Sequence, residues 1–316
     1  MYTMRRSRPI SVIVLASSSL ASCTARHDSG QRSGPQDVPA WRTRVLQDRA
    51  DKDRSFATSP TSPLAGIERF TPTAAAHVAI DGDAVRMTDG ATPGALVSFE
   101  PLDAQRWTWH GATPELAATT EDGKTRLAPG EITQPVLFRL SERFHLLARY
   151  AANTFVVTAF DRRRKEVTAF THLAYFDPDP RFVVTARLAR FDTQPRVELA
   201  TSRGLKTPYV RYGQLRFAID GKPSSLTAFH MPGSPEGALF IPFRDATSGK
   251  ASYGAARFLE AELARASADE VTLDFNAAYN PLCAYSPAWN CPLPPPENQL
   301  AVAITAGERT FGDAAH

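Results

Sequence analysis

A proline-rich segment near the C-terminus sets the strongest limit on how this chain can fold. Residues 271–298 begin with a strand-like run, but six prolines then lie between Pro281 and Pro296. Each proline fixes φ and lacks a backbone N–H donor, so this part is neither a regular helix nor an ordinary strand. If its backbone is buried, its polar groups need other hydrogen-bond partners. The segment itself offers Asp274, Asn276, Asn280, Tyr285, Glu297 and Asn298. This composition predicts either a structural clasp or a binding site.

The N-terminus has the pattern of a bacterial lipoprotein signal peptide. Three arginines precede a short apolar run over residues 10–20, which is about half of the roughly 20 residues that a membrane-spanning helix needs. The run leads into Leu-Ala-Ser-Cys, ending at Cys23, which resembles the lipobox, in which the cysteine is lipidated. We therefore predict a signal peptide over residues 1–22 and a lipid anchor at Cys23. An ordinary signal peptide with a chance cysteine is the alternative.

The residues after this cysteine predict a tethered protein of the cell envelope. Thr24 stands where an aspartate would favour inner-membrane retention in enterobacterial lipoproteins. This resemblance implies the outer membrane, with the protein facing the periplasm and held to the membrane by the acyl chains on Cys23. Residues 23–40 are polar, contain Gly and Pro and show no apolar periodicity, so we expect a flexible tether.

The charge balance argues against one class of partner. The chain has 36 Lys and Arg against 33 Asp and Glu, a net charge of +3. Arg5, Arg6 and Arg8 lie in the predicted signal peptide and account for the whole excess. The balanced mature chain therefore gives no support for nucleic-acid binding. The basic run over residues 162–165 is expected to be a solvated hairpin turn. No phosphate loop or dinucleotide fingerprint is present, and no cofactor is predicted.

Strand-like patterns dominate after residue 63. Apolar residues alternate with others along residues 182–188 and 214–219, a period typical of strands with one buried face. Asp81-Gly82 and Asp220-Gly221 are hairpin signals between such runs. We predict a mainly β fold, with an antiparallel sandwich or barrel-like C-terminal domain, a smaller N-terminal β-subdomain and a short N-terminal helix.

Two segments show helical periodicity. Residues 41–56 are dense in charge and place Trp41 and Val45 on one face, which predicts a surface helix at the entry to the fold. Residues 258–268 are predicted as a second short helix. The expected domains are the signal peptide over 1–22, the tether over 23–40, a helix with a small β-subdomain over 41–134, and a C-terminal β-domain over 135–312.

The remaining cysteines are Cys283 and Cys291, with seven residues between them. In an oxidising periplasm the expected state of such a pair is a disulfide. A metal pair and two free thiols are the alternatives. The spacing is not that of a zinc knuckle and no histidine lies near it, so no metal site is predicted. The histidines that lack any paired spacing are His77, His110, His145, His172 and His230.

The C-terminal third resembles one bacterial family in detail. The matching stretches are Leu-Phe-Ile-Pro-Phe-Arg-Asp-Ala-Thr-Ser-Gly over residues 239–249, Asp-Phe-Asn-Ala-Ala-Tyr-Asn-Pro over 274–281, Cys-Pro-Leu-Pro-Pro over 291–295 and Ala-Gly-Glu over 306–308. They resemble the domain-of-unknown-function 1684 family. The likeness is looser over residues 49–204, where Lys52-Asp53 and Phe56 are recognisable and His172 replaces an expected glycine. The resemblance implies a β-rich fold and an important C-terminal third, with no assured activity.

A polar turn follows the apolar run that ends at residue 243. Asp245 can bond its own backbone two residues on, and a glycine follows Thr247 and Ser248, so a structural turn explains the pattern. Ser248 as a nucleophile would need a base, for which His172 and His230 are conceivable. No Gly-x-Ser-x-Gly elbow or other triad signature supports that role.

The functional interpretation of this region is a buried charged cluster that faces a ligand. Asp245, Arg257 and Asp274 would form the cluster, with Tyr253 and Tyr279 as walls. The candidate ligand-binding residues are Asp245, Thr247, Ser248, Tyr253, Arg257, Asp274, Asn276, Tyr279, Asn280, Tyr285, Glu297, Asn298 and Glu308.

Two functions are compatible with these residues. The first is a small-molecule-binding or scaffold lipoprotein with a polar pocket, whose partner is a small molecule or an envelope protein. The second is an envelope hydrolase that uses Asp245, Asp274 and Glu308 as acid/base groups, with Arg257 orienting an anionic substrate. We favour the first, because no nucleophile or metal set can be assembled.

Overall fold

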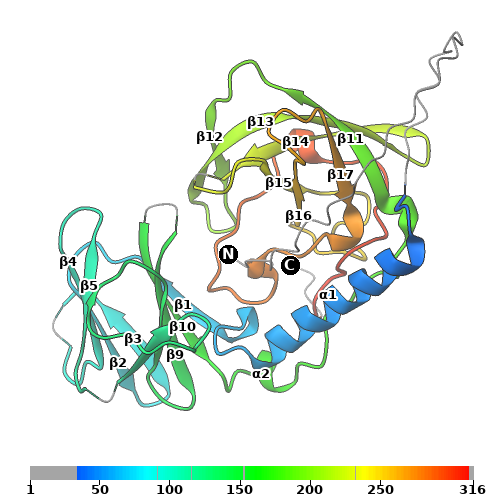
Figure 1. Ribbon diagram of the computed structural model, residues 1–316. Coiled ribbons are helices and arrows are strands. Elements are labelled where there is room, and N and C mark those ends of the chain that lie inside the picture. The colour runs from blue at the N-terminus through cyan, green and yellow to red at the C-terminus, as the bar shows by residue number, and fades with distance from the viewer. Residues whose placement is uncertain (1–33, 91, 115, 152–153, 232, 313–316) are drawn as a thin grey trace, which may run out of the picture. The chain divides into compact units, whose positions relative to one another are not determined.

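The computed structural model describes residues 34–312, except 91, 115, 152–153 and 232 (Figure 1). All three sheets are antiparallel, which confirms the mainly β prediction. The predicted signal peptide, Cys23 and most of the tether lie outside the described residues. Within them, no helix is both long enough and apolar enough to cross a membrane.

Helix α1, Val38–Thr58, confirms the predicted entry helix and begins three residues before residue 41. Asp37 caps it by accepting a hydrogen bond from the Ala40 N–H over 3.0 Å, because the first N–H groups of a helix have no partner within it. Trp41 and Val45 pack against Val183 on one side of the helix. The end of the expected tether is therefore already helical.

The N-terminal sheets share one hydrophobic core, in which Phe99, Trp109, Phe138 and Phe155 are buried. The first sheet has the strand order β1-β10-β9-β8-β6 and the second has the order β3-β2-β4-β5-β7. Strands β8, β9 and β10 of the first sheet lie beyond residue 134, so this sandwich continues past the expected boundary. The strands are β1 Gly66–Phe70, β2 Ala76–Asp81, β3 Ala84–Thr88, β4 Val97–Pro101, β5 Trp107–Gly111, β6 Ala117–Thr120, β7 Gly130–Glu131, β8 Val136–Arg139, β9 Phe144–Ala151 and β10 Thr154–Asp161.

The third sheet curls into a nearly closed barrel. Its order is β16-β15-β14-β13-β11-β17, with β12 paired to β13, and the two end strands β16 and β17 contact each other. The predicted alternation is confirmed, since Val184, Leu188, Leu215 and Phe217 all enter the barrel core. The strands are β11 Val183–Arg190, β12 Arg196–Ala200, β13 Lys206–Ile219, β14 Lys222–His230, β15 Ala238–Phe243, β16 Arg257–Glu262 and β17 Glu270–Asp274.

Both predicted hairpins are present. Strands β13 and β14 pair up to Ile219 and Lys222, so that Asp220 and Gly221 form a two-residue loop. Their φ angles are 49° and 73°, as a type I′ turn requires. Strands β2 and β3 are joined at Gly82, where φ is 57°.

The predicted helix over residues 258–268 is wrong, because Arg257–Glu262 is strand β16 and pairs with β15. Leu259 points into the barrel core, whereas Phe258 packs in a second core outside the barrel. A strand buried on both faces has adjacent apolar residues and so imitates a helical pattern.

The basic run is also not a hairpin turn. It leads from β10 into the short helix α2, Lys165–Thr168. Arg162 donates to the carbonyls of Ala57 and Ser59, each over 2.8 Å. Arg164 donates to the carbonyl of Gly66 and to the hydroxyl of Ser286. These arginines therefore connect separate segments of the chain.

The proline-rich segment continues β17 through three short 3₁₀ helices, η3 Phe275–Ala277, η4 Leu282–Ala284 and η5 Pro296–Asn298. Its hydrogen bonds go to distant segments. Trp289 donates to the Pro63 carbonyl over 3.0 Å, and Asn298 donates to the carbonyls of Thr227 and Pro242. The segment thus bonds both the start of the sandwich and the barrel.

We expect Gly307→Ala to be far more destabilising than Gly221→Ala. Both glycines have positive φ, of 79° and 73°, which costs a non-glycine residue about 1–2 kcal/mol. A Cβ on Gly307 would also lie 2.5 Å from the Ala278 carbonyl oxygen, whereas one on Gly221 meets nothing within 4 Å. Urea denaturation should show the larger loss for Gly307→Ala. Equal losses would mean that the close approach of the two backbones is unimportant.

Candidate functional site

The Asp245 carboxylate is saturated by donors from its own surroundings. Its Oδ1 accepts from the N–H and the hydroxyl of Thr247, over 2.8 and 2.6 Å. Its Oδ2 accepts from Arg257 Nη2 over 2.5 Å and from the Ile304 N–H over 3.1 Å. The turn after β15 is therefore built around this side chain, and the carboxylate faces the protein interior.

Arg257 lies beside it and has only 1% of its side chain exposed. Its Nη1 donates to the Ala306 carbonyl over 2.5 Å and its Nη2 to the Ile304 carbonyl over 2.9 Å. The guanidinium also lies over the Phe243 ring, at 5.3 Å from its centroid. Burial lowers the pKa of Arg257, and Asp245 opposes this effect. The pair joins β16 to the C-terminal segment.

The serine and threonine of the turn also have structural partners. Ser248 Oγ accepts from the Asp245 N–H over 3.1 Å, and the Thr247 hydroxyl lies 2.7 Å from that of Ser252. His230 Nδ1 lies 3.1 Å from the Ala238 carbonyl oxygen, and His172 Nδ1 lies 3.1 Å from the Thr171 hydroxyl. Within the described residues, no hydrogen bond joins either histidine to Ser248, so no serine–histidine pair is assembled.

Asp274 ties β17 to the N-terminal helix rather than joining the Asp245 cluster. Its Oδ2 accepts from Trp41 Nε1 over 2.7 Å, and its Oδ1 accepts from the N–H and side-chain amide of Asn276, each over 2.9 Å. Asn276 also exchanges two hydrogen bonds with the backbone of Asp179. The expected triad of Asp245, Arg257 and Asp274 is therefore divided between two places.

A second convergence of polar side chains forms around Glu308, which is 1% exposed. Its Oε1 accepts from Lys52 Nζ over 2.5 Å. Its Oε2 accepts from the Asn280 N–H over 2.8 Å and from the Tyr285 hydroxyl over 2.6 Å. Burial, followed by the charge of Glu308, raises the pKa of Tyr285. We call Lys52, Tyr279, Asn280, Tyr285 and Glu308 the Glu308 cluster.

The outer part of the Glu308 cluster reaches solvent. Lys52 has 22% of its side chain exposed and its Nζ lies 4.9 Å from the centroid of the Tyr279 ring. The half-buried Tyr279 donates its hydroxyl to the exposed Glu260 over 2.7 Å. Lys52 is the residue that the candidate set missed. Its place on the inner face of the helix was visible in the sequence, but its partner lies 256 residues away.

The other candidates lie apart from this cluster. Asn298 is fully buried and accepts from the Thr227 N–H over 2.7 Å. Glu297 accepts from Arg211 over 2.9 Å on the surface, with 44% of its side chain exposed. Tyr253 is buried, with its hydroxyl 3.9 Å from Cys283 Sγ. Asn298 is thus a structural residue, and Glu297 belongs to a surface ion pair.

Cys283 and Cys291 are both free thiols in the structure, which does not contain the expected disulfide. They are nevertheless neighbours, because the Cys283 N–H donates to Cys291 Sγ over 3.3 Å. The disulfide was expected from the oxidising periplasm alone, whereas the structure contains this pair as a dithiol. Among the residues that the structure describes, no group of three His, Cys, Asp or Glu side chains is arranged to hold a metal ion.

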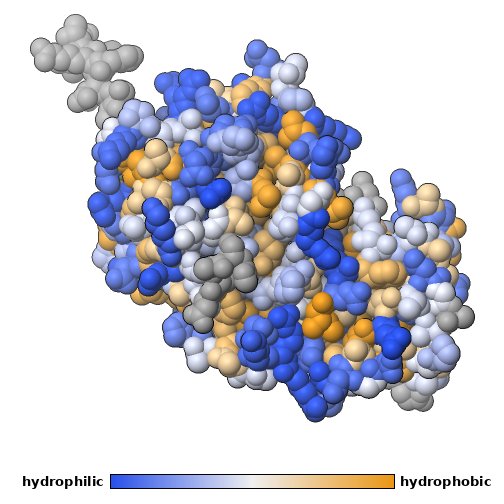
Figure 2. All heavy atoms as spheres, turned by 180° about the vertical axis from the view of Figure 1, so that it is seen from behind, coloured by the Kyte–Doolittle hydropathy of each residue, from blue (hydrophilic) through white to orange (hydrophobic). Residues whose placement is uncertain are grey.

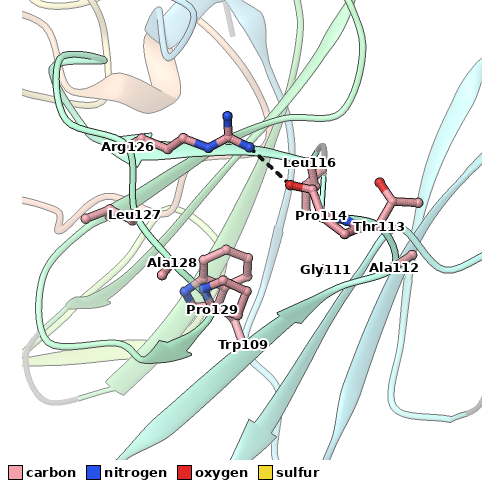
Figure 3. A pocket seen from close by; sticks show the side chains of 10 residues that line it. All are labelled: Trp109, Gly111, Ala112, Thr113, Pro114, Leu116, Arg126, Leu127, Ala128 and Pro129. Atoms are coloured by element: carbon pink, nitrogen blue, oxygen red, sulfur yellow. Dashed lines mark hydrogen bonds between the residues drawn. The ribbon is translucent and has the colours of Figure 1, made fainter.

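One hollow of about 430 Å³ lies in the N-terminal sandwich, and none of the predicted site residues lines it. Figure 3 shows Arg126 at its edge, donating to the Pro114 carbonyl over 3.1 Å, with Trp109 on the other side. On the face in Figure 2, hydrophobic residues are scattered among hydrophilic ones. We therefore place the candidate site at the polar Glu308 cluster.

The fold and site define a β-rich protein in which polar cross-links bind a proline-rich segment and a helix to a barrel. Residues 168–309 match a protein-family model described as "Protein of unknown function (DUF1684)". A solution NMR structure of an uncharacterized protein of Haloarcula marismortui is 44% identical, with 47% of this chain and 80% of that chain covered and a TM-score of 0.41. No curated protein matches the chain. The chain belongs to the DUF1684 family, which confirms the resemblance.

We expect Asp245→Asn to cost about 3–5 kcal/mol of stability, because it leaves the Arg257 charge buried without its partner. Glu297→Gln is the matched control and should cost about 0–1 kcal/mol, since its ion pair is exposed. Chemical denaturation measures both. If Asp245→Asn is as stable as the control, the buried pair does not hold the C-terminal segment.

Proposed function

We propose that this chain is a lipid-anchored protein of the bacterial cell envelope whose folded part is a binding or scaffold module. The anchor would be Cys23, at the outer membrane and facing the periplasm. Support comes from the order of the N-terminal sequence, in which a basic start, a short apolar run and a Leu-Ala-Ser-Cys tetrapeptide follow one another. The short polar stretch before α1 would keep the folded part close to the membrane.

The observation that carries the module proposal is the saturation of the three carboxylates suggested as acid/base groups. Asp245, Asp274 and Glu308 each accept three or more hydrogen bonds from the protein. A general acid or base must reach the proton that it transfers in a substrate. These groups instead cross-link segments far apart in the sequence, which favours a scaffold over a hydrolase.

Within such a module, the outer part of the Glu308 cluster is the best place for a ligand or partner. Lys52 and Tyr279 lie between the buried carboxylate of Glu308 and solvent. An ammonium group beside an aromatic ring can recognise a polar or anionic group that also stacks. This location replaces the pocket expected at the Asp245 turn, because the Asp245 carboxylate is enclosed.

We expect Cys23→Ala to release the protein from the membrane. A thioether-linked lipid needs the Cys23 sulfur, and without acyl chains the balanced charge of the chain offers little attraction to a membrane. Fractionation and labelling with a fatty-acid analogue would measure the change, with Cys291→Ala as the control that keeps its anchor. Lipid labelling that persists in Cys23→Ala would contradict the anchor.

The module proposal predicts that a stabilising ligand depends on Lys52. A thermal-shift screen with metal ions, sugars, nucleotides and lipids should be run on the wild type, Lys52→Met and Lys222→Met. Lys222 is an exposed lysine at the start of β14 and serves as the control. A probe bound at the Glu308 cluster should raise the melting temperature of the wild type and Lys222→Met and should raise that of Lys52→Met much less.

Equal stabilisation of all three proteins would place the bound probe elsewhere. Ester hydrolysis by the wild type that is lost in Glu308→Gln would support the hydrolase and contradict the module. A lack of any shift would oppose a small-molecule ligand among these classes and favour an envelope protein as the partner.

A further inference from the structure

The two free thiols form a pair with unequal access to solvent. Cys283 is half-buried, whereas Cys291 is 6% exposed. The Cys283 N–H donates to Cys291 Sγ over 3.3 Å, so the two cysteines lie side by side. A reagent in solution therefore meets Cys283 first, with Cys291 directly behind it.

Hydrogen-bond donors gather around the Cys283 sulfur. Its partners are the Cys291 thiol, the Ser202 hydroxyl and the Tyr253 hydroxyl, the last at 3.9 Å. The hydrogen bond from Cys291 is the largest cause that lowers the pKa of Cys283, to about 7. The same hydrogen bond and burial raise the pKa of Cys291. Near pH 7, Cys283 is thus about half ionised to the thiolate, whereas Cys291 stays a thiol.

The pair is held by a fixed backbone. Ser202 Oγ accepts from the Cys291 N–H over 3.2 Å, and the Ser202 N–H donates to the Cys291 carbonyl over 2.9 Å. The other titratable groups that face the thiols are Arg69 on β1, Tyr209 on β13 and Tyr253 before β16. Burial raises the pKa of both tyrosines, so both stay neutral near pH 7, and the Tyr253 hydroxyl lies 3.9 Å from Cys283 Sγ.

We propose that Cys283 and Cys291 form a thiol–disulfide exchange site, in which Cys283 attacks a small disulfide and Cys291 resolves the product. The Cys283 thiolate would form a bond to one sulfur of the substrate and release the other sulfur as a thiolate. Cys291 would then lose its proton and attack Cys283 Sγ, releasing the second half. The two cysteines lose two electrons and become a disulfide, and the substrate gains these electrons and becomes two thiols, taking one proton from Cys291 and one from solvent.

The second step is assisted by the first. Cys291 holds its proton because it donates to the Cys283 thiolate. Once Cys283 is part of a mixed disulfide, that negative charge is gone and the main cause of the raised pKa is removed. The buried thiol then becomes a stronger nucleophile at the moment when its target is beside it. This inference does not depend on the function proposed above.

The reduced full-length protein, incubated with glutathione disulfide, tests the proposal by peptide-resolved mass spectrometry, which separates both thiols from Cys23. The wild type should form a Cys283–Cys291 disulfide and release two glutathiones. Cys291→Ser should stop at a glutathione mixed disulfide on Cys283, and Cys283→Ser should not react. In the unmutated protein, iodoacetamide should label Cys283 with a half-maximal rate near pH 7 and at least about tenfold faster than Cys291.

Tyr253→Phe removes one donor and should move the midpoint of this labelling profile to higher pH, with circular dichroism showing that the fold is kept. Labelling of Cys291 as fast as Cys283, or a midpoint near the ordinary thiol value of about 8.5, would overturn the proposal. So would a Cys283→Ser variant that still takes up glutathione at Cys291. The pH dependence of iodoacetamide labelling is measured on the wild-type protein. It therefore tests the proposal even if the serine variants do not fold.

Discussion

The buried guanidinium of Arg257 holds the C-terminal segment against the barrel, and the positions of Glu308 and of α1 beside it depend on that attachment. Removing such a charge from water is costly unless its partners are complete. Asp245 supplies the opposite charge, and the carbonyls of Ile304, Ala306 and Glu308 accept the other three N–H bonds of the two terminal nitrogens. The segment is thereby fixed in position two residues before Glu308. The Glu308 carboxylate can then reach Lys52 and hold α1.

The wall of the barrel at β14, β15 and β16 is buried on both faces, and this explains how these attachments persist. Side chains that point inward form one core, while Phe229, Phe240 and Phe258 point outward into a second core with Phe56 of α1 and Trp289 of the proline-rich segment. The second core joins elements that are distant in the sequence. Apolar packing holds these segments together but does not set their orientation, because the hydrophobic effect has no preferred direction. The hydrogen bonds of Asp274, Glu308 and Asn298 set that orientation.

The composition of the proline-rich segment allowed either a structural clasp or a site, and the segment has features of both. Its backbone is satisfied by other segments, because the Leu293 N–H donates to the Ala200 carbonyl and the Cys291 N–H donates to the Ser202 hydroxyl oxygen. Such external bonds are what a run of prolines requires. The same fixed backbone presents Cys283 at the surface and keeps Cys291 behind it. A segment that is rigid for structural reasons can therefore also carry a reactive pair.

Local sequence determined the parts of this protein that depend on near neighbours. The period of residues 214–219, the Asp220-Gly221 turn and the face that carries Trp41 and Val45 follow from the geometry of strands, turns and helices, and the structure contains each of them. The family motifs also marked the C-terminal third as the part with unusual side-chain chemistry, although they did not divide it into separate sites.

Only the tertiary structure decided which of these side chains meet. It separated Asp274 from Asp245, joined Glu308 to Lys52, made residues 257–262 a strand and left the two cysteines as free thiols. The contacts of Lys52 with Glu308 and of Trp41 with Asp274 join residues more than 200 positions apart. Such contacts produce no pattern in the sequence of either segment. A strand buried on both faces likewise lacks the alternation that would reveal it. The sequence therefore specified the elements and the candidate residues, and long-range packing and desolvation chose the partners.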